Sequence, residues 1–117
     1  MTIKSEVYCT LQIEGTHNWP NCPFDEVGYL RDPHRHVFHI KAHKVVNHDD
    51  RDTEFIMLKG QIQRYINQKY CSILNQTFCE FGAMSCEMLA RELIDEFGLC
   101  RCEVNEDNEN GAILYVE

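Results

Sequence analysis

Three histidines carry the chemistry that residue type and spacing indicate most directly. His34 and His36 stand two residues apart at the start of an apolar run, and His17 follows an earlier alternating segment. Neutral imidazole is a good zinc ligand, and three protein ligands with a fourth position left open are typical of catalytic zinc. The set therefore predicts a Zn²⁺ site. The alternative is that a His-x-His pair arises by chance in a chain with six histidines and holds no metal.

The zinc prediction requires the three imidazoles to face the same side of a sheet. Successive side chains of a strand point to opposite faces. In residues 7–13 the odd positions are apolar, and His17 shares their parity. In residues 38–42 the even positions are apolar, and His34 and His36 share theirs. We therefore expect all three side chains on the buried side, at the rim of the sheet, unless a bend breaks the phase.

Composition and charge indicate a single globular domain over residues 1–117. The chain is 44% hydrophobic and 26% charged, which suffices to bury one core. Its net charge of −8 argues against a nucleic-acid partner, because phosphate binding needs clustered Lys and Arg. No apolar run approaches the roughly 18 residues of a membrane span, and the amino terminus lacks the apolar core of a secretion signal. We expect a cytoplasmic protein that does not bind a membrane.

The seven cysteines are expected to be reduced thiols. Their number is odd, and a chain with this composition can bury a core without a disulfide framework. No Cys-x-x-Cys pair indicates a structural zinc site. Cys9, Cys100 and Cys102 fall on apolar parity, so they are expected to be small core residues.

Hydrophobic periodicity assigns the remaining elements. The expected strands are 7–13, 36–46, 53–56, 100–106 and 112–116, the expected helices are 56–70 and 85–97, and the expected loops are 17–28 and 71–83. Ser85 is expected to cap the second helix, which ends near Gly98. This order predicts an α+β fold in which the helices lie on a sheet.

Glu106 interrupts the apolar alternation of the strand 100–106. It places a carboxylate on the core-facing parity of that strand. An inward carboxylate needs a partner, and a ligand with amino and ring N–H donors would supply one. The alternative is that the strand frays or bulges before Glu106 and leaves it in water.

The motifs, in this order, resemble the 6-pyruvoyl-tetrahydropterin synthase and 6-carboxy-tetrahydropterin synthase family. Residues 16–19, Thr-His-Asn-Trp, are similar to the family's Ala-His-Arg-Leu, and residues 34–38, His-Arg-His-Val-Phe, to its His-Gly-His-Asn-Tyr. Further similarities lie at residues 53–59, at Leu74-Asn75, at residues 85–90 and at Glu106. Members have the tunnelling fold, an antiparallel sheet with two helices on one face. The resemblance implies four to five strands and assembly into an oligomeric barrel.

The resemblance also implies an activity. Family members are zinc-dependent lyases that eliminate triphosphate from 7,8-dihydroneopterin triphosphate, on the way to tetrahydropterins or to 7-deazaguanine compounds such as queuosine precursors. It implies zinc on the three histidines. A pterin or purine-like substrate would bind near Glu106, Ser85 and Cys86, in a site between the subunits of a homo-oligomer.

Two departures from the family concern its proton-transfer groups. Leu30 stands where the family has a catalytic cysteine, and Tyr70 and Cys71 stand where it has an Asp-His dyad. We expect Cys22 or Glu26 to substitute, because a thiolate or carboxylate near zinc would be deprotonated. Two alternatives remain: a module that binds a pterin, purine or nucleotide without reaction, and a structural or regulatory oligomer whose histidines have no function.

Overall fold

Two long antiparallel strands form the centre of the fold in the computed structural model, which describes residues 1–72 and 75–117. They are β1 (Ser5–His17) and β2 (His34–Val46), paired along their whole length. The other elements are η1 (Asp25–Arg31), α1 (Phe55–Tyr70), β3 (Cys71–Ser72), β4 (Asn75–Gly82), α2 (Cys86–Phe97), β5 (Arg101–Glu106) and β6 (Asn110–Tyr115).

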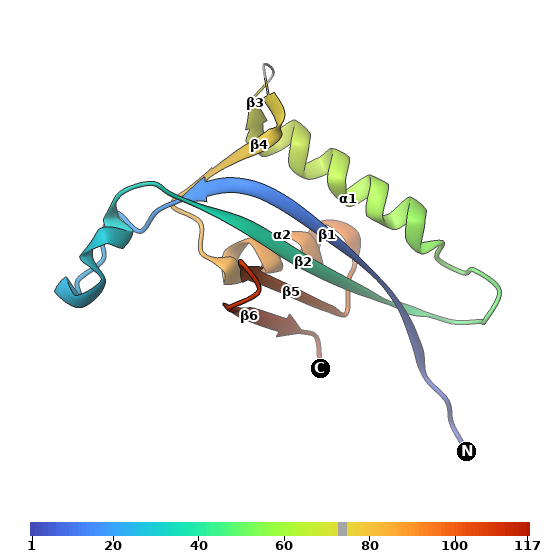
Figure 1. Ribbon diagram of the computed structural model, residues 1–117. Coiled ribbons are helices and arrows are strands. Elements are labelled where there is room, and N and C mark those ends of the chain that lie inside the picture. The colour runs from blue at the N-terminus through green and yellow to red at the C-terminus, as the bar shows by residue number, and fades with distance from the viewer. Residues whose placement is uncertain (73–74) are drawn as a thin grey trace.

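The sheet has six strands in the order β3-β4-β1-β2-β5-β6. Figure 1 shows β1 and β2 crossing the molecule as a twisted ribbon, with β5 and β6 beside β2. The expected four- to five-stranded antiparallel sheet is therefore corrected in two respects. Strands β3 and β4 lie where a loop was expected, and β4 pairs with β1 in parallel. The expectation for Leu74 lies outside the described residues.

One hydrophobic core joins both helices to the same face of the sheet. Leu58, Ile62 and Ile66 of α1 are buried together with Leu89 and Leu93 of α2. Their partners on the strands are the apolar positions that the alternation predicts, among them Leu11, Ile13, Phe38, Ile40, Cys102 and Val104. Each fully buried Leu or Ile contributes about 1.5–3 kcal/mol to folding. The α+β class, the two helices and the carboxy-terminal hairpin are confirmed.

The helix ends explain one confirmed expectation and one error. Ser85 caps α2, because its Oγ accepts a hydrogen bond from the Met88 N–H at 3.1 Å, and Gly98 ends the helix at φ 62°. The expected strand 53–56 is wrong. Glu54 instead caps α1 by accepting hydrogen bonds from the Ile56 and Met57 N–H groups, both at 3.0 Å. Within the described residues, no helix is long and apolar enough to cross a membrane.

Two further expectations are corrected by the structure. The connection between β1 and β2 contains the 3₁₀ helix η1, where only a loop was expected. The expectation of reduced cysteines fails for Cys71 and Cys79, which form a disulfide between β3 and β4. The other five cysteines are free. Cys9 and Cys102 are buried as expected, whereas Cys100 is only half-buried.

Candidate metal centre and adjoining pocket

Strand register brings the three predicted histidines and Glu106 to one end of the sheet. His17 stands directly opposite His34 in the β1–β2 pair, and His36 lies two residues further along β2. Glu106, the last residue of β5, stands opposite Phe38 on the other side of β2. All four side chains are on the core-facing parity, so they converge where the core meets solvent.

The converging side chains form a group that could hold a metal ion. His17, His34, His36 and Glu106 each offer one ligand atom, and these atoms all lie within 4.8 Å of one another. Nε2 of His17 lies 2.7 Å from Oε2 of Glu106, and Nε2 of His36 lies 3.6 Å from the same oxygen. These are close contacts without hydrogen-bond geometry. Both nitrogens are buried and have no hydrogen-bond partner among the described residues.

The second nitrogen of each imidazole does have a partner. Nδ1 of His17 lies 2.8 Å from the Met84 carbonyl oxygen, and Nδ1 of His34 lies 2.9 Å from the Asp32 carbonyl oxygen. Nδ1 of His36 lies 2.7 Å from Oδ2 of Asp107. Carbonyl and carboxylate oxygens only accept hydrogen bonds, so each Nδ1 must carry the proton and donate it. In the neutral imidazole Nε2 is then the bare nitrogen that a metal needs.

Burial and charge favour the same protonation states. Burial lowers the pKa of His17 below its usual value, and this outweighs the opposing effects of the Met84 carbonyl and of Glu106. The hydrogen bond from the Val37 N–H, and then that from His36, lower the pKa of Asp107. His17 is therefore held neutral and Asp107 ionised, as a metal ligand and its supporting carboxylate must be. The donor set fits Zn²⁺ or another transition-metal ion that accepts imidazole and carboxylate.

A pocket of about 510 Å³ adjoins the histidine cluster. His17, His34 and Glu106 form part of its wall. The start of α2 contributes Ser85, Cys86 and Met88, and the β1–β2 connection contributes Trp19 and Leu30. A small molecule in this pocket would thus touch both the candidate ligands and the apolar side chains of the connection.

Ser85 and Cys86 line this pocket, at the positions where the substrate was expected. The Ser85 Oγ is engaged by the helix cap described above. Burial, followed by the nearby charges of Glu106 and Glu87, raises the pKa of the Cys86 thiol to about 12. Cys86 is therefore a neutral thiol near pH 7, unsuited to act as a base.

The two expected catalytic residues lie on the β1–β2 connection but outside the wall of this pocket. Cys22 is buried, and its Sγ faces the Phe24 and Val27 carbonyl oxygens at 3.6 and 3.8 Å. Glu26 is exposed in the first turn of η1. Leu30, which stands where the family has its catalytic cysteine, lines the pocket. Cys71, which stands at one position of the family's Asp-His dyad, is oxidised in the disulfide.

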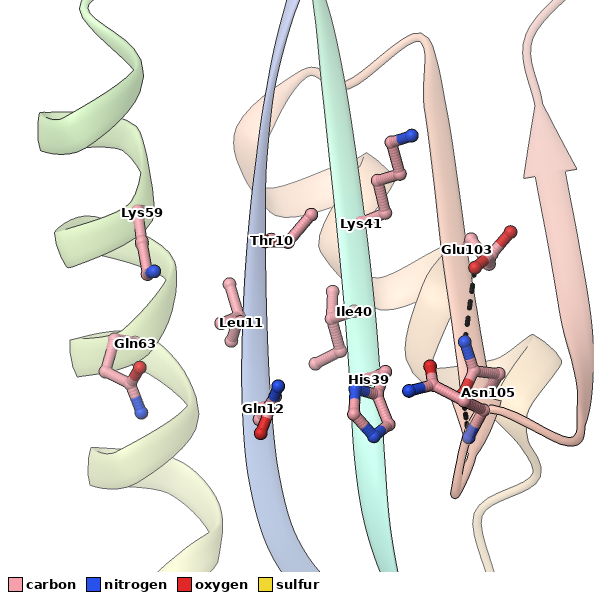
Figure 2. A pocket seen from close by; sticks show the side chains of 11 residues that line it. Thr10, Leu11, Gln12, His39, Ile40, Lys41, Lys59, Gln63, Glu103 and Asn105 are labelled. Atoms are coloured by element: carbon pink, nitrogen blue, oxygen red, sulfur yellow. Dashed lines mark hydrogen bonds between the residues drawn. The ribbon is translucent and has the colours of Figure 1, made fainter.

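A second pocket, of about 490 Å³, contains none of the predicted site residues. Figure 2 shows that Gln12, His39 and Asn105 project from neighbouring strands, with Lys59 and Gln63 on α1 beside them. Its acidic residue, Glu103, accepts a hydrogen bond from Asn105 at 3.2 Å. Among the described residues, the group of converging ligand atoms is the histidine cluster and not this pocket, so the chemistry is better assigned to the cluster.

Asp107 is a site residue that the sequence did not predict. It follows β5 and adopts a positive φ of 59°, as does Asn108 at 59°. Adjacent Asp and Asn residues between two strand patterns favour such a turn, because their side chains tolerate left-handed backbone. That signal predicts the turn but not the contact with His36, which lies 71 residues away along the chain.

Comparisons with known proteins establish the fold and leave the family unassigned. The chain is similar to the crystal structure of an uncharacterized protein, WS1659 from Wolinella succinogenes, with a TM-score of 0.66 and 15% sequence identity. The similarity covers 99% of this chain and 100% of the other. No family model matches the sequence, and no curated protein is significantly similar to it. At this level of identity the likeness concerns the fold alone.

Proposed function

We propose that the chain is a zinc-dependent lyase of the 6-pyruvoyl-tetrahydropterin and 6-carboxy-tetrahydropterin synthase type. The observation that carries this proposal is the convergence of three imidazoles whose Nδ1 atoms are all engaged, beside a pocket of about 510 Å³. Three supporting hydrogen bonds are more than a chance His-x-His pair would require. Zinc, held by His17, His34 and His36, would supply a Lewis acid that polarises a bound hydroxyl.

The substrate in this proposal is 7,8-dihydroneopterin triphosphate or a related pterin or purine-like molecule. Trp19 and Leu30 give its planar ring an apolar wall, and Glu106 offers a carboxylate for ring N–H donors. The proposal includes the tunnelling fold and a homo-oligomer with sites between subunits. Strand β6 lies at one edge of the sheet, and this position supports assembly, because joining the edges of two subunits would remove such an edge.

A second candidate function is a module that binds the same class of ligand without reaction. It is favoured by the state of two candidate acid–base groups, Cys22 outside the pocket wall and Cys86 within it. Cys22 is directed at the carbonyl oxygens of its own connection, and Cys86 is held neutral. A lyase needs a group that takes the proton, so the catalytic role of Cys22 or Glu26 stays a prediction.

Metal analysis and product analysis test the proposal together. We expect one zinc per chain in the purified protein, lost in His34→Ala and retained in His48→Ala, whose side chain is exposed and outside the cluster. The zinc-loaded protein is then incubated with 7,8-dihydroneopterin triphosphate, and the products are identified by mass spectrometry. Release of triphosphate supports the lyase. Binding without product supports the second candidate, and a well-folded protein that takes up no zinc contradicts both.

A further inference from the structure

Glu106 has an unusual position for a residue that only anchors a substrate. Its carboxylate extends between the imidazoles rather than solely into the pocket, with Oε2 at 2.7 Å from His17 Nε2 and 3.6 Å from His36 Nε2. Among the residues that the structure describes, these two histidines are its ion-pair contacts. The Glu106 side chain is 26% exposed and that of His17 only 11%, so the contact is largely shielded from water.

The arrangement leaves three polar groups poorly paired. The Nε2 atoms of His17 and His36 are buried without hydrogen bonds. The Glu106 carboxylate faces both nitrogens, but no hydrogen bond joins it to either of them. Unpaired buried polar groups are costly. A divalent cation would satisfy both nitrogens and the carboxylate at once.

We infer that Glu106 is the fourth protein ligand of the metal centre, which thereby has a complete His₃Glu donor set. The inference rests on the metal site of the proposed function and adds to it a residue with a different role there. Sites with four protein ligands are closed, whereas sites with three leave a position for water or substrate. A small molecule that coordinates this metal must therefore take the place of Glu106.

The same residue couples the metal to the pocket. Glu106 belongs to the pocket wall as well as to the ligand group. A pocket ligand with paired N–H donors would compete with the metal for the carboxylate. By linkage, such a ligand weakens metal binding by the same factor by which the metal weakens ligand binding.

Cobalt(II) is the probe that tests the inference without any assay of activity. It binds the same donors as zinc, and its visible absorption reports the identity and number of its ligands. The proteins to compare are the wild type, Glu106→Gln, Glu106→Ala and Glu103→Gln. Glu103 is a matched control, because it lies on the same strand with its side chain in the pocket on the opposite face.

We expect the Co²⁺ dissociation constant to rise by about tenfold or more in both Glu106 variants, since even an outer-shell partner contributes that much. The wild type and Glu103→Gln should bind Co²⁺ equally. Added azide should leave the visible spectrum of these two proteins unchanged. It should change the spectrum of Glu106→Ala, in which the fourth position is open to an external anion.

Two outcomes would overturn the inference, and only the second would also contradict the proposed three-histidine metal centre. If Glu106→Gln binds Co²⁺ as tightly as the wild type and azide changes both spectra, Glu106 is not a ligand, although the three-histidine centre stands. If the wild type binds no Co²⁺ at all, the proposed metal centre fails as well. Glu106→Gln preserves the shape of the side chain, so it decides the matter even if Glu106→Ala proves unstable.

Discussion

Asp107 and His36 are joined by a hydrogen bond of 2.7 Å between Oδ2 and Nδ1, which links the β5–β6 turn to β2. The other carboxylate oxygen, Oδ1, accepts from the Val37 N–H at 2.8 Å, and the Asp107 N–H donates to the Val37 carbonyl oxygen at 2.8 Å. Three bonds thus tie the turn to two consecutive residues of β2. The imidazole of His36 is oriented by the turn rather than by its own strand alone.

Asp107→Asn is predicted to weaken metal binding by about 10- to 100-fold, the usual effect of losing a carboxylate that supports a metal-bound histidine. Asparagine tolerates the φ of 59° at this position, so the turn itself is preserved. However, an amide has one acceptor oxygen where the carboxylate uses two. One of the bonds to β2 must be lost. Competition with a chromophoric zinc chelator measures the change.

The control for this prediction is Asp50→Asn. Asp50 is exposed in the turn after β2, and among the described residues its carboxylate forms an ion pair with Arg51. Its substitution should leave zinc affinity unchanged. Equal affinities of the two variants would show that Asp107 does not support the centre.

Gly15→Ala is predicted to destabilise the protein by about 1–3 kcal/mol, because the new methyl group overpacks a close contact between strands. A Cβ at this position would lie 2.7 Å from the Cys79 carbonyl oxygen and 2.8 Å from the Phe81 ring. Displacement of β4 would also move the Met84 carbonyl that orients His17. Urea unfolding measures the loss of stability.

Gly60→Ala provides a matched control in α1. Its nearest atom within 4 Å is the end of the flexible Arg64 side chain at 3.4 Å, and alanine favours a helix by about 0.5–1 kcal/mol. Gly60→Ala should therefore be neutral or stabilising. If Gly15→Ala were also neutral or stabilising, this result would contradict the close approach of β4 to β1 at Gly15.

The convergence of the candidate metal ligands could be predicted because two local patterns determine it. Alternation places His17 on the same face as Ile13, and His34 and His36 on the same face as Phe38. An antiparallel pair then needs only the correct register, and that register sets His17 opposite His34. The inward position of Glu106 follows from the same period-two rule in β5.

The remaining errors involve contacts that no local pattern encodes. Strand β4 has only Cys79 and Phe81 buried among its described side chains, and it pairs in parallel with the end of β1. The start of α1 carries exposed Phe55 and Ile56, two apolar residues in sequence that are also typical of a strand. A glutamate cap decides between the two structures there, and glutamate is not among the common cap residues.

The Cys71–Cys79 disulfide is predicted to stabilise the protein by about 2 kcal/mol, as expected for a cross-link that closes a short loop. The two cysteines are eight residues apart. Thiol titration of the unfolded, unreduced protein should detect five free thiols, and reduction should reveal seven. Reduction should lower the free energy of unfolding in the wild type and in Cys100→Ser, but not in Cys71→Ser. Seven thiols without reduction would contradict the pairing.

A pH-dependent link between the helices is predicted at Glu92. Its carboxylate on α2 accepts hydrogen bonds from Tyr70 at 2.6 Å and Tyr65 at 3.0 Å, and Lys69 lies at 3.2 Å. Burial raises the pKa of Glu92, but these three partners on α1 outweigh it and hold the pKa below 4.5. Burial, followed by the hydrogen bond to the same carboxylate, raises the pKa of Tyr70 to about 12, so Tyr70 stays a donor.

Because the pKa of Glu92 is lower in the folded state, its ionised form stabilises the fold above the unfolded value of 4.5, and this contribution is lost as the pH falls through the folded pKa. Glu92→Gln should therefore cost about 1–3 kcal/mol near pH 7, where a charged hydrogen-bond partner is removed. The difference from the wild type should shrink as the pH falls below 4.5. Thermal unfolding across this range measures it. Glu96→Gln, an exposed position on the same helix, should show no comparable change, and a pH-independent effect of Glu92→Gln would contradict the assigned ionisation.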